Sequence, residues 1–249
     1  MEFGWVFFAA AVPAVLMAGI SKGGFETAGA IAAAPLLALV IDPRAAVALM
    51  LPLLMLMDVA SLRAYWRRWR WPEARMLMLG AVPGVAVGWA VFGAVSADGV
   101  RLMIGLLAVG FVAYSLARRF GAIGAGAAQP LPAGLFWGSL AGFTSFVGHA
   151  GGPPAAIYLF GRRLAKTPFQ ATSVVTFWWV NLIKFPPYVA LGMFGADTAK
   201  ATLILAPVGI AGVLIGAWAH RRVSEVWFFG LTYCLLGATG VKLISDAVT

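Results

Sequence analysis

Two short glycine-containing segments carry the residues whose chemistry could recognise a ligand. The first, residues 19–26, reads Gly-Ile-Ser-Lys-Gly-Gly-Phe-Glu and interrupts an apolar stretch. Glycine pairs let a chain reverse direction and expose its backbone amides. A helix that begins after this break would direct free N–H groups and the positive end of its dipole toward Lys22, which predicts an anion site. The substrate-binding candidates here are Ser21, Lys22, Gly23, Gly24 and Phe25.

Two other interpretations of this first segment remain open. It reads equally as an ordinary loop with one lysine that extends to the membrane surface. Glu26 could also cap the next helix or pair with Lys22, which would lower the local positive charge and weaken the argument for an anion.

The second segment, residues 142–154, reads Gly-Phe-Thr-Ser-Phe-Val-Gly-His-Ala-Gly-Gly-Pro-Pro and again contains a glycine pair. A proline fits the first turn of a helix, so a new apolar segment is expected to begin at 153. That segment, 153–161, is too short to cross the hydrocarbon at about 1.5 Å per residue. We therefore expect a re-entrant hairpin, with the substrate-binding candidates Thr144, Ser145, His149, Gly151, Gly152 and Pro153.

His149 is the one histidine beside a predicted helix break. A histidine at membrane depth is expensive, so we favour a functional role over a satisfied core histidine. Protonated it would attract an anion, and neutral it would release one. An intramembrane hydrolase that uses Ser145 and His149 is a weaker alternative, because neither a Gly-x-Ser-x-Gly elbow nor an orienting acid accompanies them. We expect that the protein is not an enzyme and that it binds neither a cofactor nor a metal. Cys234 is the only cysteine, which rules out an internal disulfide.

Segment 169–191 carries polar residues on roughly one helical side. They could line the path of a polar substrate, although hydrogen bonds between helices or plain packing would also account for them. The candidates are Thr172, Ser173, Asn181 and Trp178. Asp58 and Lys184 lie near segment ends, where charged residues are more often interfacial or paired.

The composition indicates that membrane helices position these residues. Of 249 residues, 62% are hydrophobic and 11% are charged, with a mean hydropathy of +0.92. The net charge is +9, and the basic residues lie in short clusters between apolar runs. This pattern indicates contact with lipid headgroups rather than binding of nucleic acid. We predict one all-α, polytopic membrane domain with segments at 3–20, 27–41, 44–62, 76–95, 99–117, 133–147, 153–161, 169–191, 200–219 and 225–244.

Three short motifs recur in the second half of the chain and predict that the two halves are related. Gly23-Gly24, the Gly84-x-x-x-Gly88 motif and Val95-Ser96 recur 128 residues later. We expect two repeats of about five segments, 1–120 and 133–249, joined by a cytoplasmic linker at 121–132. An odd number of segments inverts the second repeat, so the broken helices of both repeats would meet near the midplane.

Loop charge predicts the orientation. If the loop after the third segment is cytoplasmic, that side holds twelve of the eighteen basic residues: Arg63, Arg67, Arg68, Arg70, Arg75, Arg118, Arg119, Arg162, Arg163, Lys166, Arg221 and Arg222. Both termini then lie on the outer, periplasmic side.

The segments Ala18–Phe25 and Gly138–Pro154 resemble the TauE/SafE family of sulfite and organosulfonate exporters, also grouped as toluene-sulfonate uptake permeases. The resemblance implies an alternating-access transporter of sulfite, sulfoacetate or related anions in a bacterial inner membrane, with a coupling proton as one candidate partner. A channel or carrier for another oxyanion or carboxylate, and a membrane protein that transports nothing, are the alternatives. The sequence predicts neither the oligomeric state nor the direction of transport.

Overall fold

The chain folds entirely into α-helices and loops in the part that the computed structural model describes, residues 3–24, 29–121, 128–220 and 225–249. Ten helices occur there, and each matches one of the ten predicted segments, so the all-α fold class is confirmed. They are α1 (Trp5–Gly24), α2 (Gly29–Ala38), α3 (Pro43–Ala64), α4 (Trp71–Ala94), α5 (Ala97–Arg119), α6 (Ala133–Gly148), α7 (Gly152–Gly161), α8 (Lys166–Ala190), α9 (Ala196–Ala219) and α10 (Glu225–Val248).

Five of these helices, α1, α3, α4, α5 and α9, are long and apolar enough to cross a bilayer. Capping residues fix where two of them begin. The side chain of Asp42 accepts a hydrogen bond from the backbone N–H of Ala45 at the start of α3, and Ser96 caps α5 through the N–H of Gly99. The helices α2 and α7 have 10 residues each, about 15 Å, which is half the thickness of the hydrocarbon.

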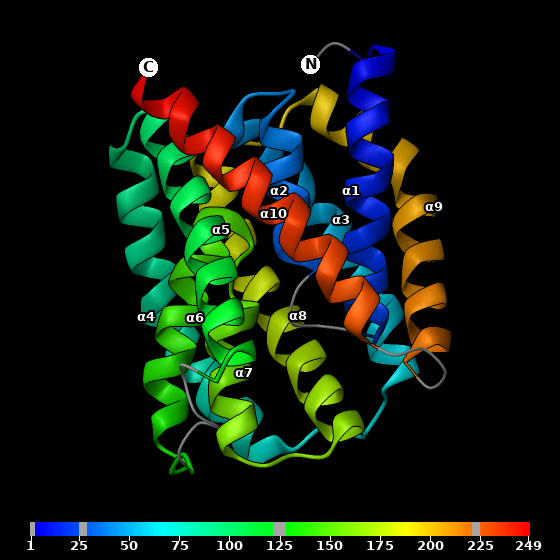
Figure 1. Ribbon diagram of the computed structural model, residues 1–249, viewed down its shortest axis with the longest axis vertical. Coiled ribbons are helices and arrows are strands. Elements are labelled where there is room, and N and C mark those ends of the chain that lie inside the picture. Colours follow the sequence, from blue (N-terminus) through cyan, green and yellow to red (C-terminus); the bar gives the residue numbers. More distant parts are fainter. Residues whose placement is uncertain (1–2, 25–28, 122–127, 221–224) are drawn as a thin grey trace.

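Two hairpins enter the molecule from opposite ends (Figure 1). The outer ends of α1 and α2 lie at the end that holds both termini, whereas the outer ends of α6 and α7 lie at the other end. The basic loops 65–70 and 162–165 also lie at the end opposite the termini. The other ends of these four helices therefore lie inside the molecule.

The helices pack as two bundles, each of which contains one helix from the other half of the chain. The first bundle comprises α1, α2, α3 and α9, and the second comprises α6, α7, α8 and α4. The most extensive contacts in the molecule are α4 with α6 and α1 with α9. The fourth helix of each half thus packs against the hairpin of the other half, while α5 and α10 pack on each other.

Glycines allow these two crossings to be close. A Cβ atom on Gly23 would overlap the carbonyl oxygen of Val213 in α9, and one on Gly84 would overlap that of Ser139 in α6. Close backbone approach of this kind is the usual role of small residues between membrane helices. The Gly84-x-x-x-Gly88 motif therefore has a structural role in packing α4 against α6.

Candidate functional site

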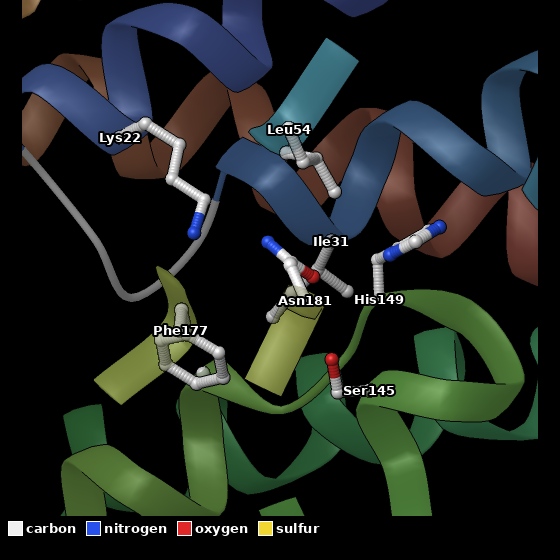
Figure 2. Close-up of a pocket in the computed structure, with 8 residues that line it drawn as sticks. Lys22, Ile31, Leu54, Ser145, His149, Phe177 and Asn181 are labelled. Atoms are coloured by element: carbon white, nitrogen blue, oxygen red, sulfur yellow. The ribbon is translucent and has the colours of Figure 1, made fainter. Parts of the chain in front are cut away.

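The tips of the two hairpins line one small cavity deep in the molecule (Figure 2). The first hairpin contributes Lys22 and Ile31, and the second contributes Ser145, His149 and Gly152. Leu54 of α3 and Phe177 and Asn181 of α8 complete the wall. The cavity measures about 20 Å³, room for roughly one or two water molecules. Residues that flank both predicted helix breaks therefore line the same cavity.

A buried ion pair lies at one side of the cavity. The ammonium of Lys22 is 2.9 Å from Oδ1 of Asp58, and these side chains are 3% and 0% exposed. Asn181 donates its amide N–H to the other carboxylate oxygen, Oδ2, over 2.6 Å. Figure 2 shows the side chains of Lys22 and Asn181 pointing toward each other. The ring of Phe177 faces the same ammonium, with 5.0 Å from Nζ to the ring centroid.

A second buried amine, that of Lys184 in α8, holds the turn between α6 and α7. Its Nζ lies 3.1 Å from the carbonyl oxygen of Ser145, 3.0 Å from Oγ of Ser145 and 3.0 Å from Nδ1 of His149. These three contacts match the three N–H donors of an ammonium. Lys184 is completely buried, and two of the residues that it contacts, Ser145 and His149, line the cavity.

The contacts of His149 fix its tautomer. Its Nε2 lies 2.9 Å from the carbonyl oxygen of Val47, which can only accept, so Nε2 carries a proton. Nδ1 then accepts from Lys184. Both ring nitrogens are thereby used, and neither is available to activate the hydroxyl of Ser145. His149 also adopts a left-handed backbone conformation (φ 55°), which ends α6 and allows the chain to turn.

Gly23 and Gly24 do not line the cavity, and residues 25–28, where the free amides before the next helix were expected, lie outside the described residues. Gly23 and Gly24 belong to the last turn of α1, where carbonyl groups lack helical partners. Four side chains donate to these carbonyls: Ser61 and Gln170 to Lys22, Tyr65 to Gly23, and His220 to Gly24. At the start of α7, Pro153 and Pro154 lack N–H groups. The donors around the cavity are therefore mainly side chains.

The side-chain hydrogen bonds to the last carbonyl groups of α1 have counterparts at the end of α6, at a constant spacing in the sequence. Tyr65 donates to the carbonyl of Gly23, and Tyr188 donates to that of Phe146. Ser61 donates to the carbonyl of Lys22, as Lys184 does to that of Ser145. The differences 188 − 65, 146 − 23, 184 − 61 and 145 − 22 all equal 123.

This spacing corrects the predicted pairing of Gly23-Gly24 with Gly151-Gly152. The first pair ends α1, whereas the second begins α7. The spacing of 128 residues holds only for the helices that cross the hairpins. A Cβ on Gly84 would meet Ser139, and one on Gly212 would meet Leu16, so here the glycines differ by 128 and their partners by 123.

Several predicted site residues lie outside the cavity. Ser21 and Ser173 are buried, and Gly151 packs against the carbonyl of Ala141. Thr144 donates to the carbonyl of Leu140 and, with Pro153, lines a separate apolar cavity between α5, α6 and α7. Phe25, like Glu26, lies outside the described residues.

Two of the four path-lining candidates have other surroundings. Thr172 accepts a hydrogen bond from the backbone N–H of Arg70 and donates to Pro168. Trp178 is 36% exposed and lies in a surface hollow with Arg63 and Trp66. Asn181 is the candidate of this group that the structure brings to the cavity.

Asp58 and Lys184 were not predicted as site residues, yet both contact residues that line the cavity. Their signal in the sequence was a charged residue inside an apolar segment, which is by default a functional candidate in a membrane protein. The prediction that they are paired is correct for Asp58.

One family model, Sulfite exporter TauE/SafE, matches residues 11–243, which is all but the two ends of the chain. No curated protein and no solved structure matches it.

Proposed function

We propose that this chain, which belongs to the sulfite exporter TauE/SafE family and is a membrane transporter, exports a small sulfur-containing anion such as sulfite, sulfoacetate or another organosulfonate. The observation that carries the proposal is a pair of buried lysines at one cavity: Lys22 of the first hairpin lines it, and Lys184 of α8 contacts Ser145 and His149, which also line it. Ammonium groups at membrane depth are expensive and mark the path of an ion.

The donors around the cavity suit an oxyanion. Lys22, Asn181 and the hydroxyl of Ser145 can each direct a hydrogen bond toward a bound oxygen atom. A tetrahedral sulfonate or a pyramidal sulfite offers three oxygens on one sulfur atom. A planar carboxylate offers two, so we favour the sulfur anions over carboxylates.

The small size of the cavity favours a carrier over an open channel. A sulfite ion is larger than the space of about 20 Å³, so it can enter only when the walls separate. We infer alternating access in which the first bundle rocks against the second, because the cavity lies between them. The two bodies that move are then the first bundle (α1, α2, α3 and α9) and the second bundle (α4, α6, α7 and α8). They are not the two sequence halves, residues 1–120 and 133–249.

The repeated hydrogen bonds support an inverted repeat. A hairpin and a long helix of each half carry the same contacts, and the hairpins enter from opposite ends (Figure 1). By the positive-inside rule we infer that the basic loops are cytoplasmic and that both termini lie on the outer side, which is the periplasm if the membrane is a bacterial inner membrane.

The test is transport and binding by the purified protein. Thermal unfolding is measured with sulfite, sulfoacetate, methanesulfonate, acetate and chloride, because a ligand that binds the folded state raises Tm. Flux of the stabilising anion is then measured in proteoliposomes. We expect saturable flux that Lys22→Gln weakens and Lys200→Gln, a change at an exposed lysine, leaves intact. Absence of binding and flux for all of these anions would refute the proposal, and conductance without saturation would indicate a channel.

A hydrolase that uses Ser145 and His149 receives less support. Both ring nitrogens of His149 have partners other than Ser145. Loss of a protein- or lipid-cleaving activity in Ser145→Ala would revive that alternative.

A further inference from the structure

The carboxylate of Asp58 occupies the donors that an anionic substrate would need. Its Oδ1 contacts the ammonium of Lys22 and its Oδ2 accepts from Asn181, and both donors line the cavity. Asp58 itself is fully buried and does not line the cavity. In the closed structure, Asp58 therefore acts as an internal anion bound to part of the site.

We propose that the substrate anion replaces Asp58 on Lys22 and Asn181, and that the displaced carboxylate takes up one proton, so that anion and proton cross the membrane together. This inference rests on the proposed function. The proton comes from the aqueous side to which the site is open and binds a carboxylate oxygen of Asp58. On the opposite side the anion leaves, the proton is released to water, and the carboxylate returns to Lys22.

Burial makes the proton necessary. A carboxylate that loses its charged partner inside a protein is strongly destabilised, and it accepts a proton rather than stay ionised and unpaired. A bound anion beside an ionised Asp58 would add repulsion between like charges. Protonation removes both costs at once.

The charged and titratable groups around Asp58 come from three elements. Lys22 lies in α1, Lys184 in α8 and His149 at the turn before α7. The described side chains of α2 include no titratable group, and the charged residues of α5 and α9 lie near the helix ends. The two lysines favour the ionised carboxylate until an incoming anion competes for them.

His149 is a poorer site for this proton. Its Nε2 already carries a hydrogen that is donated to Val47. A second proton on Nδ1 would point at the ammonium of Lys184 and break that contact. The second half of the chain supplies a further observation, because the counterpart of Asp58 at the spacing of 123 residues is Asn181, a neutral residue with nearly the shape of a protonated aspartate.

The experiment measures anion binding and proton uptake in the same sample. Methanesulfonate is the probe, because it keeps a single charge between about pH 6 and pH 8. In weak buffer with a pH indicator, the wild type should take up one proton for each anion bound. Its affinity should fall about tenfold for each unit rise in pH above the point at which free Asp58 is ionised. The purified full chain is used throughout.

Three variants and one exposed control locate the proton. Asp58→Asn should bind methanesulfonate without proton uptake and with a flat pH profile, whereas Asp58→Glu and the exposed control Asp98→Asn should keep the wild-type slope. His149→Gln should also keep it. Proton uptake that persists in Asp58→Asn, or that vanishes in His149→Gln alone, overturns the proposal.

The wild-type measurement remains decisive if Asp58→Asn does not fold. Binding of methanesulfonate by the wild type without proton uptake refutes the proton step and leaves the proposed function intact. A wild type that binds and moves none of the anions refutes the proposed function, and this inference with it.

Discussion

Adding one methyl group to Gly84 tests whether the crossing of α4 and α6 is as close as it must be to hold the second hairpin. The new Cβ of Gly84→Ala would overlap the carbonyl oxygen of Ser139 and lie 2.7 Å from its carbon and 2.9 Å from the nitrogen of Phe143. Ordinary contacts begin near 3.4 Å. Both clashing groups are backbone, and the carbonyl oxygen is the nearer one, so the helices must separate by roughly 1–1.5 Å.

The magnitude follows from two opposing terms. Overpacking of this kind costs about 1–3 kcal/mol or more, whereas alanine gains up to about 1 kcal/mol over glycine in a helix. We expect a net loss of about 1–2 kcal/mol. For a chain of this length that is a fall in Tm of roughly 2–8 °C.

The assay is thermal unfolding of purified variants in one detergent, followed by tryptophan fluorescence. Gly110→Ala is the matched control, because a Cβ there meets nothing within 4 Å, and it should be neutral or slightly stabilising. Gly212→Ala should be destabilising like Gly84→Ala, because its Cβ would lie 2.7 Å from the carbonyl oxygen of Leu16. Equal Tm values for Gly84→Ala and Gly110→Ala would refute the close crossing.

Three further results are expected. Lys184→Met should abolish anion binding by releasing the α6–α7 turn, and unchanged affinity would remove this lysine from the site. Tyr65→Phe and Tyr188→Phe each leave a buried carbonyl without its tyrosine donor, which should cost about 1–3 kcal/mol in denaturation measurements; a large loss in one variant only would argue against the repeat. Trp178→Ala should leave anion affinity as it is, because the indole lies at the surface; a weaker Kd would place it on the path.

The sequence predicts the helices well because each depends on local composition. An apolar run bounded by glycine, proline or charge is enough to place a membrane helix, and all ten segments coincide with helices. The hairpin nature of α6 and α7 also follows from length alone. Lys22 and His149 could be found because they stand next to helix breaks.

The partners of these residues could not be found in the same way. Asp58 and Asn181 lie 123 residues apart in the chain, and no pattern in either segment indicates that they meet. The glycine pairs gave the wrong spacing between the two halves. They repeat after 128 residues, whereas the residues that form equivalent hydrogen bonds repeat after 123. Register at a helix end depends on which groups need a donor, and this is a property of the folded structure.

The exchange of α4 and α9 between the bundles also affects how the protein is made. The glycine-lined side of α1, near the start of the chain, is covered by α9, whose last residue is Ala219. A ribosome must therefore synthesise most of the polypeptide before the first hairpin gains its permanent neighbour. A fragment that stops at Phe120 lacks this cover entirely, so the two halves are expected to assemble together rather than one after the other.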